Sequence, residues 1–372
     1  MNNHIGLEEI RDALANQNHP WQAGMTSMSS LPPDEQQQRL GVKPPPGDPT
    51  VDEVAQRAEQ LRGQIQALAL ERNARVTLPG AFDMRNLDGG NYITDIRDQG
   101  SCGSCVAFGC VATAEGRLRR QTGNPNLPID LSEAYLFFVH GRARGRNCDN
   151  GWWPAEALQD FQNKGVVDEE CDPYDLRKTD GSGVCADAAS RLSTITGSTE
   201  LTKDPAKIKD WLVNQGPVCA CFVVYNDFFS YSSGVYKHVA GDQAGGHCVS
   251  IIGYNDNPGY WICKNSWGKG WGEQGFFNIA YGECGIDSWS NFGVNAVLYS
   301  GWRNNTQVQG LWAIDQQRNA WAYFASLGWK KISNETDAIF YTMLSDLIAA
   351  KAAGRPVNFF EQNNTIKQLY VF

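Results

Sequence analysis

Cys105 lies between a short glycine- and serine-rich stretch that begins at Gln99 and an apolar run with helical spacing. This pattern predicts a loop that becomes a helix near Ser104, with Cys105 in the first turn. Unpaired backbone N–H groups and the positive end of the helix dipole favour thiolate over thiol, which lowers a thiol pKa that starts at ~8.5. The stretch therefore predicts a nucleophilic cysteine.

Other uses of the Cys102-Gly-Ser-Cys105 spacing are open from the residues alone. The pair could form a disulfide, half of a zinc site or a thioredoxin-type redox pair. A zinc site needs four nitrogen or sulfur ligands, but the sequence has no second Cys-x-x-Cys and no closely spaced histidine pair. The polar stretch from Thr94 to Gly100 does not fit the buried strand that precedes a redox motif. We therefore expect no metal, and the redox pair stays a minor alternative.

A nucleophilic cysteine needs a base and a group that orients the base. The candidate bases are the five histidines His4, His19, His140, His238 and His247. Only His247 opens an apolar, strand-like run after a flexible loop. A second such run ends at Asn265, whose amide oxygen could accept a hydrogen bond from the His247 ring. Trp267 could cover that bond and exclude water, which would strengthen it.

These segments resemble the active-site signatures of the papain-like cysteine peptidases, the cathepsin family. The motifs are Gln99 to Cys105, Gly246-His247, and Lys264-Asn-Ser-Trp-Gly-Lys-Gly-Trp-Gly. Their order is that of the family, and their separations lie at or slightly beyond the ~130–150 residues expected. The resemblance implies an α+β, papain-like fold with two lobes, a helical left lobe and a β-barrel-like right lobe.

The resemblance also implies a role for each matching residue. Cys105 is the nucleophile, a thiolate paired with protonated His247, which returns its proton to the leaving amine. Asn265 fixes the tautomer of the ring, and Gln99 stabilises the oxyanion together with the Cys105 backbone N–H. No cofactor is expected. The chain departs from the family at Val106, where tryptophan is usual.

The stretch from Asn147 to Pro154 is similar to the substrate-binding loop of the family. The resemblance gives Gly151 the task of pairing its backbone with an extended substrate. Asn150 replaces a glycine of that loop, and asparagine tolerates positive φ better than most residues. Trp152 and Trp153 are expected either to contact substrate or to pack in the wall, and both uses are open.

Two tryptophans complete the expected substrate site. Trp267 matches one of the family's paired tryptophans, and we group it with the substrate-binding residues. Trp289 ends a segment, Cys284-Gly-Ile-Asp-Ser-Trp289, that is similar to the one lining the floor of the family's S2 pocket. Because tryptophan is larger than the residues often found there, we expect a shallow S2 pocket that prefers small P2 side chains.

The chain has 11 cysteines, an odd number, so at least one thiol is free. By resemblance, Cys102 pairs with Cys148, and Cys171 pairs with Cys185. The cysteines expected to be buried thiols are Cys110, Cys219, Cys221, Cys248 and Cys263. The cysteine content favours a secreted or extracytoplasmic location, whereas the first residues lack the basic and apolar blocks of a signal peptide.

Residues 1–77 are predicted to be an inhibitory propeptide; a merely supportive extension is the alternative. The segment Trp21-Gln-Ala-Gly24 is similar to a motif of cathepsin B-type propeptides, and we expect the Trp21 region to lie across the cleft. Apolar spacing predicts helices over 7–16, 31–41 and 52–72. The stretch from Leu78 to Arg85 is similar to the mature N-terminus of the family, so activation cleavage is expected shortly before it.

The chain of 372 residues can bury a large core in more than one domain. Residues 78–300 are predicted to be the peptidase domain, and residues 301–372 a small α+β domain of unknown role. Its aromatic residues could form a ligand-binding face, although core packing is commoner; they are Trp312, Trp321, Tyr323 and Trp329. The net charge of -9 offers no basic surface for nucleic acid, and no apolar run is long enough for a membrane span.

The sequence therefore predicts a cysteine endopeptidase made as a zymogen. Its partners are protein or peptide substrates and its own propeptide, which acts as an intramolecular inhibitor. A catalytically inactive papain-like binding protein is the alternative, and the intact set of Cys105, His247, Asn265 and Gln99 argues against it. Exopeptidase action lacks support because the sequence has no His-His insertion.

Overall fold

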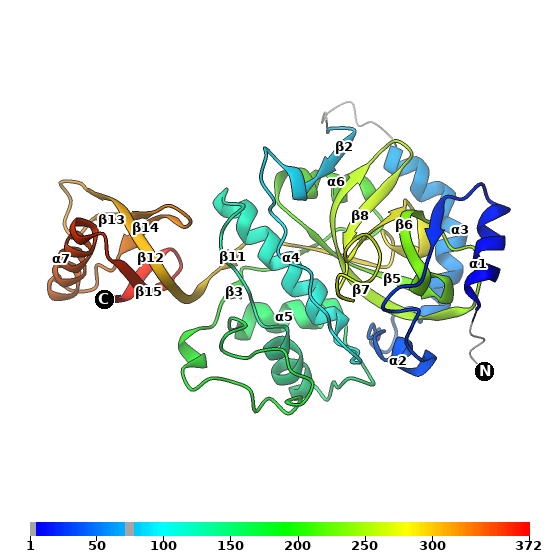
Figure 1. Ribbon diagram of the computed structural model, residues 1–372, viewed down its shortest axis with the longest axis horizontal. Helices are drawn as coiled ribbons and strands as arrows, with labels where there is room; N and C mark the ends of the chain where they lie inside the picture. Colours follow the sequence, from blue (N-terminus) through cyan, green and yellow to red (C-terminus); the bar gives the residue numbers. More distant parts are fainter. Residues whose placement is uncertain (1–4, 71–77) are drawn as a thin grey trace.

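The computed structural model describes residues 5–70 and 78–372 (Figure 1). A twisted sheet on one side and a small barrel at the other end flank a central group of helices. The sheet has the strand order β1-β6-β9-β8-β7-β5-β10-β4, and β2 pairs with β7. Its strands are β1 (Trp21–Ala23), β2 (Ala81–Asp83), β4 (Ser198–Glu200), β5 (Val218–Tyr225), β6 (Tyr231–Tyr236), β7 (Gln243–Asn255), β8 (Tyr260–Lys264), β9 (Phe276–Ala280) and β10 (Ser290–Val294).

The central strands are apolar along almost their whole length because both of their faces are covered. In β5, every residue from Val218 to Val224 is buried. Helix α4 (Cys105–Thr122) packs closely on β7. The backbone of Gly109 in α4 lies against the Cys248 side chain of β7, because a Cβ on Gly109 would be only 2.7 Å from Cys248 Sγ. The two predicted strand-like runs, the one opened by His247 and the one that ends at Asn265, are confirmed as β7 and β8.

The helical lobe is built around α4. Its other elements are the π-helix η2 (Tyr135–Gly141), α5 (Pro154–Lys164) and a two-stranded sheet of β3 (Thr194–Ile195) and β11 (Val297–Leu298). Helix α6 spans Pro205–Asn214. Short 3-10 helices are η1 (Met84–Asn86), η3 (Ala188–Ser190), η4 (Asn226–Ser230) and η5 (Glu283–Gly285).

The N-terminal segment packs against the sheet side of the molecule (Figure 1). Its helices are α1 (Leu7–Ala15), α2 (Pro33–Gln38) and α3 (Val51–Leu70), which confirms the first two predicted helices with shorter bounds and the third with a start one residue earlier. The predicted end of the third helix at Arg72 and the cleavage expected before Leu78 lie outside the described residues. Strand β1 of this segment extends the sheet by pairing antiparallel with β6.

The C-terminal residues form a closed barrel of five strands in the order β12-β13-β14-β16-β15. Its elements are β12 (Ser300–Ala313), β13 (Ala320–Phe324), β14 (Gly328–Ile332), α7 (Asp337–Ala353), β15 (Pro356–Gln362) and β16 (Thr365–Val371). Strands β14 and β16 are parallel, the other pairs are antiparallel, and α7 connects the third strand to the fourth. This is the topology of an OB-fold. The sequence predicted a small α+β domain here, but not its closure into a barrel.

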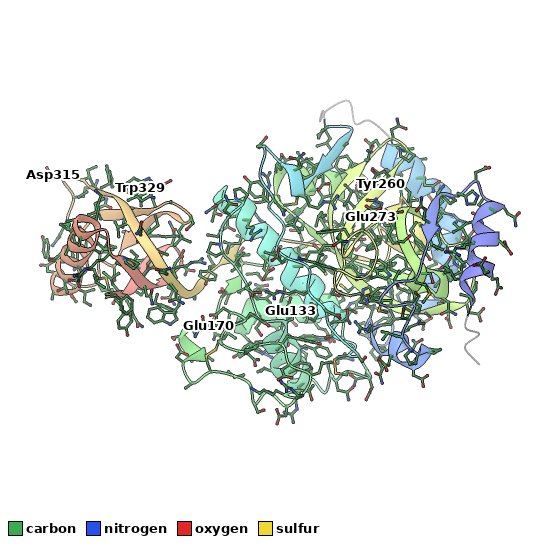
Figure 2. All side chains as sticks on the ribbon, viewed as in Figure 1. Glu133, Glu170, Tyr260, Glu273, Asp315 and Trp329 are labelled. Carbon is green, nitrogen blue, oxygen red and sulfur yellow. A yellow bond between two sulfur atoms is a disulfide. The ribbon has the colours of Figure 1, made fainter. Side chains whose placement is uncertain are left out.

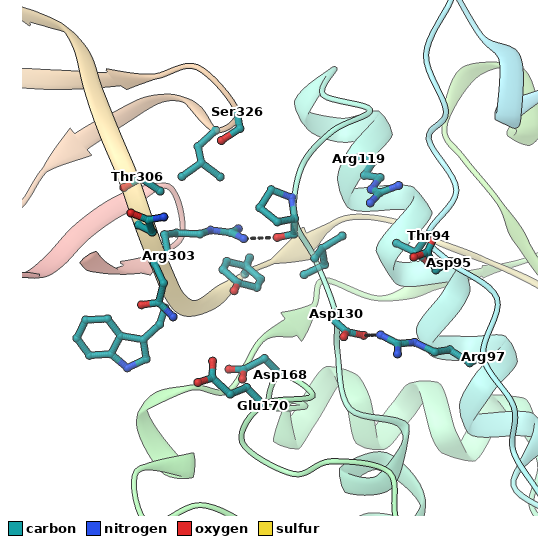
Figure 3. Close-up of a pocket in the computed structure, with 17 residues that line it drawn as sticks. Thr94, Asp95, Arg97, Arg119, Asp130, Asp168, Glu170, Arg303, Thr306 and Ser326 are labelled. Carbon is teal, nitrogen blue, oxygen red and sulfur yellow. Dashed lines mark hydrogen bonds and ion pairs between the residues drawn. The ribbon is translucent and has the colours of Figure 1, made fainter. Parts of the chain in front are cut away.

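The barrel meets the helical lobe across a cavity of about 610 Å³ (Figure 3). Arg303 of β12 donates a hydrogen bond to the Pro128 carbonyl across this junction, and Arg97 and Asp130 form an ion pair in the opposite wall. Among the described helices, none has the length and apolar character needed to cross a membrane.

Candidate active site

Cys105 is the first residue of α4, and its side chain is fully buried. Ser104 is the N-cap but makes no side-chain cap hydrogen bond, so no cap side chain competes for the N–H groups of the first turn. The main chain of Cys248, the residue after His247, hydrogen-bonds the Cys105 thiol. The packing of α4 on β7 therefore brings the predicted nucleophile and base to one place.

His247 lies on β7, and Asn265 follows directly after β8, the neighbouring antiparallel strand. His247 Nε2 donates to Asn265 Oδ1 at 2.7 Å, as predicted. The Trp267 ring covers the pair, with its centroid 4.6 Å from that of the imidazole. His247 Nδ1 is buried and has no hydrogen-bond partner in residues 5–70 and 78–372, so it is the ring nitrogen that remains for chemistry.

Gln99 is completely buried in the loop before α4. Its Nε2 donates to the main-chain carbonyls of Cys102 (2.8 Å) and Arg39 (3.0 Å). Its Oε1 accepts a hydrogen bond from Ser266 Oγ at 2.7 Å, which fixes the direction of the amide. Ser266 is not among the site residues predicted from the sequence, where its place next to Asn265 is the one signal for it.

The residues that cover this site are those from Arg39 to Lys43, which follow α2. The Val42 N–H donates to the Gly246 carbonyl at 3.1 Å, beside His247. The main chain of Gly41 hydrogen-bonds the Cys105 thiol. A Cβ on Gly41 would lie 1.9 Å from the Gly103 carbonyl oxygen, so the segment touches the loop before α4 backbone to backbone.

The prediction that the Trp21 region crosses the cleft is wrong. Trp21 lies in β1, where its indole N–H donates to the Lys237 carbonyl at 2.8 Å and its ring contacts Tyr231 and Tyr236. A large apolar ring finds more apolar surface among these aromatic side chains than in a polar cleft. Trp21 therefore anchors the N-terminal segment on β6, while the residues around Gly41 reach the cysteine.

Burial controls both titrating groups of the covered cleft. It raises the pKa of Cys105 to about 12, although main-chain hydrogen bonds from Gly41 and Cys248 oppose the change. It lowers the pKa of His247 to about 4, against the hydrogen bond to Asn265. Both groups are therefore neutral at pH 7 in this covered state. The lowered thiol pKa predicted from the helix terminus does not hold here because desolvation outweighs the dipole.

Comparisons with known proteins agree with this geometry. The family described as "Papain family cysteine protease" matches residues 78–294. This chain belongs to the papain family of cysteine proteases. It is 36% identical over 262 residues to a "Gut-specific cysteine proteinase" of Caenorhabditis elegans. The alignment covers 63% of this chain and 77% of that protein. It is 36% identical over 222 residues to "Cathepsin B-like CP2" of Giardia intestinalis, with 56% and 72% covered.

Solved proforms share the fold of this papain-family chain. Procathepsin B S9 from Trypanosoma congolense superposes with a TM-score of 0.62 and 24% identity, over 78% of this chain and 98% of that one. Digestive procathepsin L 3 of Tenebrio molitor gives a TM-score of 0.57 and 24% identity, over 77% and 87%. The predicted papain-like fold and the predicted class of cysteine peptidase are thus confirmed.

The backbone of one wall of the papain-family cleft pairs with the covering segment. Gly151 is predicted to pair with an extended substrate; while the covering segment is in place, its N–H donates to the Asn147 carbonyl within the loop and not to that segment. Trp152 makes that pairing instead: its N–H donates to the Gly41 carbonyl at 2.8 Å, and its carbonyl accepts from the Lys43 N–H at 2.9 Å. Gly151, at φ +58°, lets Gly41 approach, since a Cβ there would lie 2.0 Å from the Gly41 oxygen.

The remaining loop residues pack rather than reach into the cleft. The Trp152 side chain is buried and its indole N–H donates to Glu156 at 2.9 Å, so only its backbone faces the covering segment. Asn150 closes the loop through hydrogen bonds with Asn147 N–H (2.8 Å) and the Gly145 carbonyl (2.9 Å). No described contact joins Asn150 to the covering segment.

Trp289 lies at the position predicted for the pocket floor. Its ring packs against Trp153, with the centroids 5.9 Å apart. A Cβ built on Gly246 would meet both Trp289 Cη2 (2.6 Å) and Val42 Cβ (2.9 Å), so the indole and the Val42 side chain lie over the same glycine. The space next to Trp289 is thus taken by a small β-branched side chain.

The cysteines fall into the predicted classes. Disulfides join Cys102 to Cys148 and Cys171 to Cys185. The free cysteines of the described chain are all buried: Cys105, Cys110, Cys219, Cys221, Cys248, Cys263 and Cys284. Within the described residues, one group of three possible metal ligands lies close together: Cys171, Cys185 and Asp187. Its two cysteines are already joined in a disulfide.

Proposed function

We propose that this chain is the zymogen of a cysteine endopeptidase, in which the Cys105–His247 pair becomes active when residues 39–43 leave the cleft. The observation that carries the proposal is the Arg39 carbonyl, which accepts a hydrogen bond from Gln99 Nε2 at 3.0 Å. A substrate carbonyl has to occupy that place to be polarised by Gln99. The covering segment and a substrate therefore exclude each other.

We infer the following reaction from the positions of these groups. Without the cover, water reaches the cleft and the proton can move from the Cys105 thiol to His247 Nδ1, because the desolvation that keeps both groups neutral is relieved. The sulfur then attacks the substrate carbonyl carbon, and Gln99 with the Cys105 N–H stabilises the oxyanion. His247 gives its proton to the leaving amine, and a thioester remains on Cys105.

Water completes the cycle. His247, now neutral, takes a proton from a water molecule that attacks the thioester carbonyl, and the sulfur leaves as the acid product forms. The hydrogen bond to Asn265 occupies Nε2 and holds the ring, so that Nδ1 is the nitrogen that carries the proton in both steps. Trp267 shields this bond from competing water.

An epoxysuccinyl thiol reagent tests the proposal. The chain trimmed just before Leu78 should be labelled stoichiometrically at Cys105 and should cleave internal bonds of peptide substrates. The full-length chain should be labelled far more slowly, and Cys105→Ala should not be labelled in either form. Equal labelling rates for the trimmed and full-length chains would refute the inhibitory role of residues 39–43. Absence of labelling in the folded, trimmed chain would favour the inactive binding protein instead.

A further inference from the structure

The aromatic residues left open by the sequence lie on the outside of the barrel. In β13, Ala320, Ala322 and Phe324 fill the interior, whereas Trp321 and Tyr323 alternate with them and point outward. Cross-strand register places Trp312 beside Trp321 and Tyr323 beside Trp329. Trp312 and Trp329 are each 45% exposed. We call these four residues, Trp312, Trp321, Tyr323 and Trp329, the aromatic face (Figure 2, where Trp329 is labelled).

Each ring of the aromatic face also carries a polar group. Among the described residues, Trp321 alone of the four uses its polar group for a hydrogen bond, to Asn319 Oδ1 at 3.1 Å. The indole N–H groups of Trp312 and Trp329 and the Tyr323 hydroxyl are left for a ligand. No aliphatic side chain points outward from the paired positions of β13 and β14. The face therefore suits a ligand with both C–H surfaces and hydroxyl groups better than a purely apolar partner.

The charge of the aromatic face is small. Lys331, opposite Trp321, is the cation at its edge, and Arg318 in the preceding loop is paired with Asp337 at 3.4 Å. Single-stranded nucleic acids need a positively charged groove that follows the phosphates, and this face has none. Charge therefore favours an uncharged ligand.

A cavity of about 370 Å³ continues the aromatic face toward α4. Trp329 belongs to both, and the cavity wall includes Asn363 and Asn364 from the turn between β15 and β16. Asn364 Oδ1 is held by Lys330 Nζ at 3.0 Å, which leaves its amide N–H groups for other acceptors. Stacking surface and amide groups thus adjoin at Trp329.

We propose that the aromatic face and this cavity bind an uncharged oligosaccharide chain. The C–H faces of successive sugars would stack on the rings, and their hydroxyl groups would bond the free indole N–H groups and the Asn363 and Asn364 amides. OB-folds bind oligonucleotides and oligosaccharides on the outer side of their second and third strands and in the loops beside it. Of these two ligand classes, the low charge of the aromatic face favours an oligosaccharide over an oligonucleotide. Such a site would hold the peptidase on glycan-bearing material.

Binding of cellohexaose, chitohexaose and laminarihexaose to the full-length chain tests the proposal, by tryptophan fluorescence and calorimetry. At least one hexasaccharide should bind saturably, and Trp329→Ala and Trp312→Ala should each weaken it about tenfold or more, the effect of losing about one stacking contact. Tyr341→Ala is the matched control, because Tyr341 is 62% exposed on α7, outside the face. It should bind as tightly as the parent chain.

Several results would overturn the proposal. These are no binding of any of the three hexasaccharides, unchanged binding in the Trp312→Ala/Trp329→Ala double variant, or binding of an oligothymidylate that competes with the sugar. A dimer in sedimentation that Trp312→Ala dissociates would assign the face to a second copy instead. Near-ultraviolet circular dichroism and Cys105 labelling after trimming verify that each variant is folded.

Discussion

At the scale of single residues, the covered cleft holds its two titrating groups in their neutral forms. Burial raises the pKa of Cys105 and lowers that of His247, so the ion pair that the proposed mechanism requires is absent while residues 39–43 stay in place. The same burial links protonation to the position of the cover. A group that titrates differently in the covered and uncovered states shifts the balance between them as pH changes.

Acidification should therefore weaken the cover in a Cys105→Ala chain, where His247 cannot take up the thiol proton and has to bind a proton from solvent. The pKa of His247 is about 4 in the covered state and 6.5 ordinarily, so between these pH values the uncovered state binds the extra proton. The stability of the covered state is present above pH 6.5 and is lost as pH falls toward 4. We expect the dissociation constant of a peptide of residues 5–70 from the trimmed Cys105→Ala chain to rise by up to about tenfold per pH unit in this range.

A peptide with Arg62→Met is the control for this pH dependence. Arg62 pairs with Glu283 of the enzyme at 3.3 Å, a second group whose titration could loosen the cover. The variant peptide should bind more weakly at every pH but keep the rise between pH 6.5 and 4. If the dissociation constant of the parent peptide did not change between pH 6.5 and pH 4, the assignment to His247 would be contradicted.

Trp289 is predicted to set the P2 preference. Because the indole and Val42 fill the space over Gly246, the trimmed enzyme should prefer small P2 side chains and disfavour Phe and Arg. Trp289→Ala should increase kcat/KM for substrates with Phe at P2 by at least about tenfold, as expected when a pocket gains room for several carbon atoms. A P2-varied fluorogenic library measures both. Trp329→Ala, far away on the barrel, should leave the profile unchanged; a parent enzyme that prefers Phe or Arg would contradict the prediction.

At the scale of elements, glycines let the covering segment lie directly on the loops of the cleft. Gly41 passes between Gly103 and Gly151, and a Cβ at Gly41 or Gly151 would come within about 2 Å of a carbonyl oxygen of the neighbouring segment. The adjacent Trp152 then pairs its backbone with Gly41 and Lys43. The cover therefore binds the cleft through direct backbone contact. Any side chain at position 41 larger than that of glycine would prevent this contact.

Gly41→Ala should consequently open the full-length chain. The added methyl group meets the Gly103 carbonyl, which belongs to rigid backbone, so the segment itself has to move. We expect the full-length variant to be labelled at Cys105 at least about tenfold faster than the parent, the result of a loss of about 1.4 kcal/mol. Gly63→Ala, on α3 with no atom within 4 Å of its Cβ, should not accelerate labelling. Equal rates for the two variants would contradict this role of Gly41.

At the scale of the whole molecule, buried charges tie the barrel to the peptidase domain. Glu361 accepts hydrogen bonds from Arg303 (2.9 Å) and Lys330 (2.7 Å), and all three side chains are almost fully buried. Burial opposes ionisation of Glu361, but the two cations prevail and lower its pKa below the ordinary value. Arg303 also reaches the Pro128 carbonyl across the cavity of Figure 3. The barrel therefore shares one charge network with its junction.

Glu361→Gln should destabilise the barrel strongly. Loss of the carboxylate leaves two buried cations without compensation, which costs about 3–5 kcal/mol. Urea unfolding monitored by fluorescence measures the change. Glu335→Gln is the matched control, because its ion pair with Lys367 is exposed and contributes less than about 1 kcal/mol. A Glu361→Gln barrel as stable as the control would show that the network adds no stability.

The sequence by itself determined the family, the four residues of the proposed catalytic group and most elements. Cys105, His247, Asn265 and Gln99 were predictable because short motifs carry their chemistry, and the helices and strands were predictable from apolar periodicity. The tertiary structure alone decided what covers the cleft, that Trp152 rather than Gly151 pairs with it, and that Ser266 orients Gln99. It also decided that β14 closes the barrel and turns Trp321 and Trp329 outward. These features depend on pairing between backbone segments far apart in the chain, which local side-chain patterns do not encode.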